Sequence, residues 1–108
     1  MADEHAFRLR SDAALEQLYK ALVKQADQHD FECDYGGTLT VEFDEPAAKF
    51  VVSPNAPVEQ IWVSAQMKSY KLSWDEQRGE FVLPETGQSL RELMAGVVSQ
   101  QLGESVAL

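Results

Sequence analysis

The spacing of apolar residues changes along this chain, and that change constrains the fold more than any other feature. Over residues 14–26 the apolar side chains recur at helical spacing, which predicts an amphipathic helix, and Ser11 is a candidate cap for its start. Phe7 lies where it could extend the apolar stripe by a turn or more toward the N-terminus. From residue 30 onward the spacing is two, which is typical of half-buried strands.

The period-two region divides into short runs separated by turn residues. Residues 30–34 and 38–44 flank Gly36-Gly37 and predict a hairpin. The later runs are interrupted by residues 54–57, by the polar stretch near Lys68 and by residues 75–79, and they cover residues 49–53, 60–66, 70–74 and 80–83. We expect one meandering antiparallel sheet of five or six strands.

A second helix closes the pattern. Ser89-Leu90-Arg91-Glu92 is a capping box, an apolar stripe follows at helical spacing, and Gly103 is the expected end. Beyond it, two outcomes are open for the tail: Val106 and Leu108 fold back into the groove between the two helices, or the tail is frayed. The order of elements predicts a two-layer α+β sandwich in which both helices pack on one face of the sheet.

Charge narrows the classes of partner. Lys and Arg number 9 and Asp and Glu 18, a formal net charge of −9, which disfavours binding to nucleic acid or an anionic membrane and favours cations or a basic protein surface. The single cysteine excludes an intramolecular disulfide, and no apolar run reaches signal-peptide or membrane-spanning length. A cytoplasmic location is expected, with the mitochondrial matrix as the alternative for a mature form lacking a transit peptide.

Three segments carry a resemblance to a known family: Gly37-Thr38-Leu39-Thr40-Val41, Pro57-x-x-Gln60-Ile61-Trp62-Val63-Ser64, and Gly87-x-Ser89-Leu90-x-Glu92-Leu93. In this order and spacing they resemble the frataxins, including the bacterial CyaY group, over nearly the whole chain. The resemblance implies that residues 1–108 form one frataxin-like domain. It also implies an accessory protein of iron–sulfur cluster assembly that binds and regulates a cysteine desulfurase and its scaffold protein. Weak iron binding, ferrous or ferric, is implied too, without an organic cofactor and with a monomer expected in the absence of iron.

The strand that contains the most specific motif also contains the best candidate for a partner surface. If Ile61 and Val63 face the core, the two-residue period sends Gln60, Trp62 and Ser64 to the opposite, solvent-facing side. An exposed tryptophan beside polar residues is typical of an interface anchor, and the resemblance places the partner surface here.

The alternative is that Trp62 is half-covered by neighbouring side chains, such as Tyr70 or Trp74, and only stabilises the sheet.

Acidic residues crowd the end of the first helix and the first strand, and Glu16 is a candidate from one helix face. The strand residues Asp30, Glu32 and Asp34, with Asp27 before them, are candidate ligands because clustered carboxylates suit hard cations, including iron. The alternative is a solvated charged face.

The frataxins have an acidic ridge on this helix and strand, and the strand positions of this chain match it. On the helix, this chain departs from the family pattern. Lys20 and Lys24 occupy positions where the family commonly has acidic residues. Glu16 is therefore a candidate ligand by its spacing alone, and Asp27 lies beside a small gap in the alignment with the family. Iron binding weaker than is usual for the family is therefore expected. His29 and Cys33 stand four apart, but zinc needs four suitable ligands, and no zinc site is predicted.

No nucleophile, base and orienting group form a recognisable triad, and no glycine loop is suited to phosphate. The main hypothesis is therefore a non-catalytic interaction protein. Two alternatives remain: a ferroxidase or iron-storage protein acting at the acidic edge, and an interaction module that has lost iron binding.

Overall fold

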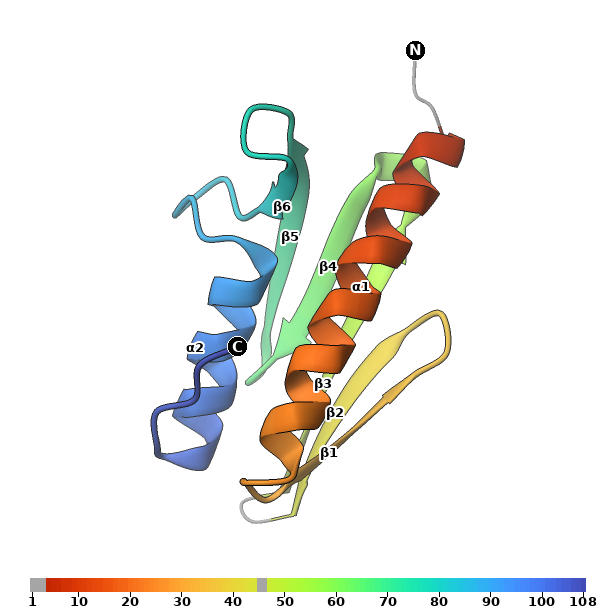
Figure 1. The fold of residues 1–108 in the computed structure, drawn as a ribbon. Coiled ribbons are helices and arrows are strands. Elements are labelled where there is room, and N and C mark those ends of the chain that lie inside the picture. The colour runs from red at the N-terminus through yellow and green to blue at the C-terminus, as the bar shows by residue number, and fades with distance from the viewer. Residues whose placement is uncertain (1–3, 45–46) are drawn as a thin grey trace.

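Along the chain, one helix precedes the six strands and a second helix follows them (Figure 1). The computed structural model describes residues 4–44 and 47–108. The elements are α1 (Glu4–Ala26), β1 (Phe31–Tyr35), β2 (Leu39–Asp44), β3 (Ala47–Asn55), a short 3-10 helix η1 (Ala56–Val58), β4 (Gln60–Ala65), β5 (Lys68–Asp75), β6 (Glu80–Val82) and α2 (Leu90–Leu102). The predicted order of helix, strands and helix is confirmed.

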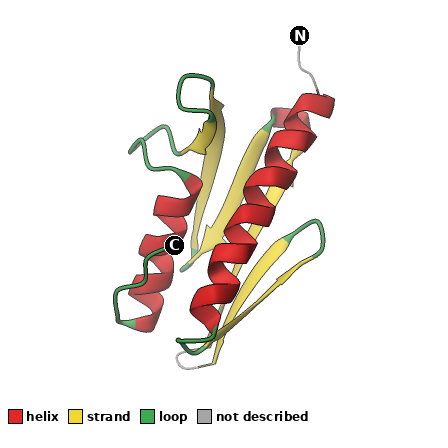
Figure 2. Cartoon of the chain, viewed as in Figure 1, coloured by secondary structure: helices red, strands yellow, loops and turns green. Residues whose placement is uncertain are grey.

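The strands form one antiparallel sheet in the order β1-β2-β3-β4-β5-β6, so each strand pairs with its neighbour in sequence. Both helices lie on the same face of this sheet, which leaves the other face open (Figure 2). Alternate residues of each strand enter the core, for example Leu39 and Val41 on β2, and the intervening residues point outward. The predicted two-layer α+β sandwich is confirmed.

Helix α1 begins at Glu4, so the extension of its apolar stripe through Phe7 is confirmed, whereas Ser11 is not its cap. Ser11 is buried inside the helix, and its hydroxyl donates a hydrogen bond to the Arg8 carbonyl oxygen at 3.2 Å. The reason is tertiary: Phe7 is buried and its ring packs edge-on against Phe81 with centroids 5.9 Å apart. Burial of these additional N-terminal turns outweighs the local capping signal of a serine.

Strand β3 also runs past its predicted end at residue 53, since Pro54 pairs with Ile61 and Asn55 with Gln60. The fixed φ of proline is compatible with extended backbone. The chain then turns through η1.

The second helix has the predicted ends. The Ser89 hydroxyl accepts a hydrogen bond from the Glu92 backbone N–H at 3.1 Å, the Glu92 carboxylate accepts one from the Ser89 N–H at 3.0 Å, and Gly103 ends the helix at a φ of 73°. Of the two outcomes open for the tail, the structure shows the folded-back one: Val106 is buried, and its N–H donates to the Ser99 hydroxyl at 2.9 Å. Among the described residues, no helix has the length and apolar character needed to cross a membrane.

Candidate functional site

The outward face of β4 carries the predicted partner residues. Ile61 and Val63 are buried in the core, whereas Gln60, Trp62 and Ser64 point to the opposite side. Trp62 keeps 37% of its surface exposed, which is a large apolar side chain left open on a sheet face. The predicted orientation of this strand is therefore confirmed.

Polar neighbours hold the Trp62 ring in place. Its indole Nε1 donates a hydrogen bond to the Gln60 side-chain oxygen at 3.0 Å, and the Gln60 amide nitrogen donates to the Ser73 hydroxyl at 3.4 Å. The Lys71 ammonium lies 4.9 Å from the centre of the Trp62 ring, within the range of a cation–π interaction. These contacts restrict the orientation of the exposed indole.

Tyr70 and Trp74, the two examples given in the alternative considered from the sequence, do not cover Trp62; the side chains that contact its ring are those of Gln60 and Lys71. Both belong to the helix-covered face: Tyr70 is paired with Val63, and the Trp74 ring packs on Phe81 with centroids 5.2 Å apart. The strand period explains the error, because Tyr70, Leu72 and Trp74 share one face of β5.

The acidic residues of β1 lie on the same open face as Trp62. Glu32 and Asp34 point outward, and the strand register sets Glu32 directly opposite Glu42 on β2, which in turn faces Lys49 on β3. Two carboxylates directly opposite each other repel. Glu42 was not among the residues predicted from the sequence for this acidic group. Pairing the two strands about the Gly36-Gly37 turn would have placed Glu42 opposite Glu32.

Glu16 lies apart from the residues that connect α1 to β1. Burial raises the pKa of the Tyr35 hydroxyl, and the nearby carboxylates of Asp12 and Glu16 raise it further, so Glu16 lies near the Tyr35 end of β1. Its carboxylate is 3.3 Å from the Lys20 ammonium, one turn along the helix. Asp30 immediately precedes β1, whose five residues span about 13 Å at the usual rise.

The five predicted iron ligands therefore do not converge on one point. Among the residues that the structure describes, no group of three or more His, Cys, Asp or Glu side chains is arranged to hold a metal ion. Asp27 and Asp30 are exposed in the segment between α1 and β1, whereas Glu32 and Asp34 are exposed on the strand. Iron binding at these residues stays a prediction.

His29 and Cys33, the pair considered for zinc, have separate roles. The His29 Nδ1 atom contacts the Glu104 carboxylate, which ties the α1–β1 connection to the end of α2. Cys33 is half-buried on the inner side of β1, where burial raises the pKa of its thiol and the Asp34 carboxylate raises it further. A thiol held protonated in this way is a poor metal ligand.

The acidic group and Trp62 form one continuous surface. The register runs from Asp34 through Thr40 and Val51 to Ser64, so the row beside Trp62 extends to β1. Three strand spacings separate Asp34 from Ser64, about 14 Å. We call this surface, with Glu32, Asp34 and Glu42 at one end and Gln60, Trp62, Ser64 and Lys71 at the other, the open sheet face.

The fold and this face define a small two-layer domain with one open, partly acidic sheet surface built around a tryptophan. A model of the frataxin-like domain family matches residues 1–104. The chain therefore belongs to the frataxin-like family.

Individual relatives are consistent with this assignment. The chain is 33% identical over 70 residues to the iron-sulfur cluster assembly protein CyaY of Azotobacter vinelandii, a match that spans 65% of this chain and 63% of that protein, less than two thirds of its length. It is 28% identical over 106 residues to the protein of the same name from Dechloromonas aromatica, covering 98% of both chains. The solved structure of a frataxin from Psychromonas ingrahamii superposes with a TM-score of 0.77 at 19% identity, covering 97% of this chain and 96% of that one.

Proposed function

We propose that this chain is a cytoplasmic accessory protein of iron–sulfur cluster assembly that binds a cysteine desulfurase and its scaffold protein and regulates the desulfurase. The names of the relatives support the pathway. The observation that carries the proposal is the open sheet face, on which Trp62 stands exposed with its ring held by Gln60 and Lys71.

Trp62 serves as the apolar anchor of this contact. An indole brings a large contact area, and the hydrogen bond from Nε1 to Gln60 restricts its rotation before binding, so little further side-chain entropy is lost. Tryptophans in such positions are enriched among the residues that dominate binding energy, and their truncation typically costs about 2–4 kcal/mol.

The acidic end of the open sheet face complements a basic patch on the partner. Glu32, Asp34 and Glu42 project from adjacent strands, and the chain carries a net charge of −9. Charges of this kind speed encounter and orient the partner, and their effect weakens as salt is added. The acidic end therefore governs the association rate, whereas Trp62 governs the lifetime of the complex.

Iron, ferrous or ferric, binds weakly at the acidic edge as cargo or signal rather than as a resident cofactor. The repulsion between Glu32 and Glu42 favours a cation near β1, with Asp30 and Asp34 adjacent. Affinity is low because the carboxylates are not preassembled and Glu16 is already paired with Lys20. A ferrous titration followed by amide NMR tests this: broadening confined to residues 27–34 and Glu42 supports the site, and uniform broadening removes it.

A second candidate function is an interaction module without iron. The observation in its favour is the absence of a converging ligand group among the described residues. This candidate predicts that partner affinity is the same with and without ferrous iron.

The test is calorimetric titration of the desulfurase–scaffold complex from the same cells with wild type and Trp62→Ala, with and without ferrous iron. We expect Trp62→Ala to weaken binding by about thirtyfold or more at unchanged circular dichroism. Val23→Ala is the matched control, since Val23 has a similar exposure of 38% but lies on α1, in the other layer. Wild-type affinity of Trp62→Ala contradicts the proposal.

A further inference from the structure

A groove on the helical side of the molecule is independent of the open sheet face. It lies between the first half of α1, the β5–β6 hairpin and the start of α2, and its volume is about 500 Å³. In Figure 1 this is the region where α1 diverges from β6 and from the beginning of α2. Leu9, Ala13 and Trp74 contribute apolar surface, and Leu9 is 60% exposed.

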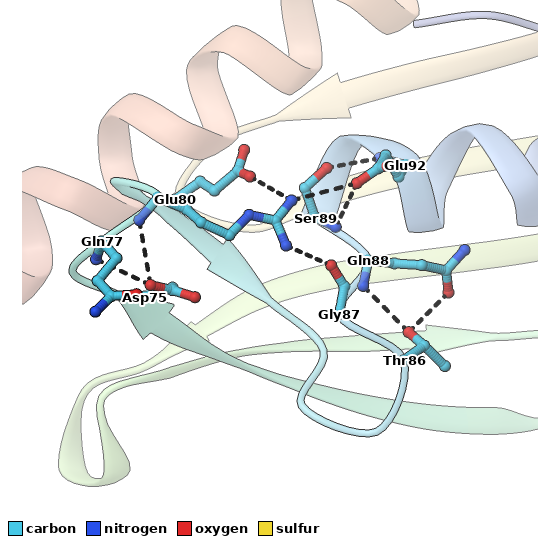
Figure 3. A network of polar contacts seen from close by, with 9 residues as sticks. Asp75, Gln77, Glu80, Thr86, Gly87, Gln88, Ser89 and Glu92 are labelled. Atoms are coloured by element: carbon cyan, nitrogen blue, oxygen red, sulfur yellow. Dashed lines mark hydrogen bonds and ion pairs between the residues drawn. The ribbon is translucent and has the colours of Figure 1, made fainter.

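The wall of the groove formed by β6 and α2 is held by the polar network drawn in Figure 3. The Arg78 guanidinium is 2.7 Å from the Glu80 carboxylate and 3.6 Å from that of Glu92, and it donates a hydrogen bond to the Gly87 carbonyl oxygen. The Ser89–Glu92 capping box fixes the adjacent helix start. Glu80, the one carboxylate among the described groove residues, is therefore paired with Arg78, which it shares with Glu92.

Two arginines line the groove in addition to that network. The Arg10 guanidinium lies 4.8 Å from the centre of the Trp74 ring, and its ion pair within the described part of the chain is a long, exposed contact of 3.8 Å with Glu76. Arg91 is exposed, and its side chain makes no ion pair or hydrogen bond with the residues that the structure describes.

The position of Arg91 is unfavourable for helix stability. It is the second residue of α2, after the Ser89 cap, and the positive end of the helix dipole disfavours a cation there. A residue that breaks a local stability rule without a compensating contact in the fold indicates a role outside the fold.

We propose that this groove binds an acidic, apolar segment of a partner protein. A leucine or phenylalanine side chain of the segment enters the apolar floor beside Leu9, Ala13 and Trp74, and flanking carboxylates pair with Arg10 and Arg91. The volume lies within the range of about 300–1,000 Å³ that is usual for binding sites. The two arginines direct an acidic segment to this groove, because the chain as a whole has a net charge of −9 and repels acidic segments elsewhere on its surface.

The test is an NMR titration of the full chain with the capped peptide Glu-Leu-Glu-Phe-Glu. The chain has two tryptophans, one on each face of the sheet, so their indole signals report which face is occupied. We expect saturable shifts of the Trp74 indole and the Arg10 and Arg91 side chains, with no shift of the Trp62 indole. The peptides Glu-Ser-Glu-Ser-Glu and Lys-Leu-Lys-Phe-Lys, which lack the apolar or the acidic component, are expected to bind at least about tenfold more weakly.

Substitution separates binding from folding. Arg91→Glu is expected to weaken the acidic peptide by about tenfold while raising the melting temperature, because an anion suits the first turn of α2. Lys24→Glu, which makes the same charge change on α1 away from the groove, leaves the peptide affinity unchanged.

The proposal is overturned if the three peptides bind equally, if Trp62 rather than Trp74 responds, or if Arg91→Glu binds as well as wild type. Equally tight binding of free octanoate would instead assign the groove to a small carboxylate and contradict the peptide occupant.

Discussion

The Lys71 ammonium lies 4.9 Å from the centre of the Trp62 ring, and the two residues are directly paired across β4 and β5. Lys71 therefore covers one face of an otherwise exposed indole and leaves the rest of the side chain available to a partner. The pair links the stability of the sheet to the surface that we assign to binding.

Removal of this cation is expected to have a small, measurable cost. Lys71→Ala should lower the free energy of unfolding by about 0.5–1 kcal/mol, the usual size of an exposed cation–π interaction, whereas Lys71→Arg should retain it. Urea denaturation measures both. Lys68→Ala, at the exposed first residue of β5, is the control, and an equal loss in both alanine variants would mean that Lys71 does not act through the ring.

The facing carboxylates of Glu32 and Glu42 are expected to strain the β1–β2 hairpin. Glu32→Gln should raise the free energy of unfolding by about 0.2–1 kcal/mol at low salt. The gain should shrink near 1 M salt, where the screening length falls to about 3 Å. Glu85→Gln, which removes a charge from an exposed turn, should show no such gain. A salt-independent effect of Glu32→Gln would contradict the electrostatic explanation.

The capping box makes part of the stability depend on pH. Hydrogen bonds from the Ser89 backbone and hydroxyl lower the pKa of Glu92, and the nearby Arg78 guanidinium lowers it further. Because the folded pKa is below the unfolded value of about 4.3, the contribution is fully present above that pH and is lost as pH falls through the folded pKa.

Glu92→Gln, which preserves the side-chain shape, should therefore be less stable than wild type near neutral pH and equal to it in strong acid. Denaturation at about pH 7 and about pH 3 measures the difference. A destabilisation that is the same at both pH values would show that the charge of Glu92 is not responsible.

The C-terminal tail is expected to contribute to the core. Truncation after Gly103 removes the buried Val106, leaves the Ser99 hydroxyl without its two partners on that residue and also removes the exposed contact between His29 and Glu104. The free energy of unfolding should fall by about 2 kcal/mol, the value of one buried aliphatic side chain. Thermal unfolding measures the loss, Ala107→Ser at an exposed position is the control, and an unchanged melting temperature would show that the tail adds no burial.

Features set by neighbouring residues were predictable from the sequence. The alternation of apolar and polar residues predicted that Trp62 points outward, because Ile61 and Val63 beside it are apolar. The Ser89–Glu92 capping box was equally local, since both partners lie within one helical turn.

Features that depend on contacts between distant residues were not predictable in this way. The start of α1 depends on Phe7 meeting Phe81 of β6, a contact between residues far apart in the sequence. The partners Lys71 and Glu42 become visible only when strand register is known, and the separation of Glu16 from Asp30 only when α1 is placed on the sheet. Closeness in the sequence therefore overstated how close the acidic side chains of the predicted iron site lie in space.

The most direct test of the open sheet face as the partner surface is an amide chemical-shift map of the labelled chain bound to the desulfurase–scaffold complex. The largest perturbations, including the Trp62 indole, are expected on the outward residues of β3, β4 and β5, with weaker, salt-sensitive changes at Glu32 and Glu42. Perturbations confined to α1 and α2, with the Trp62 indole unmoved, would contradict it.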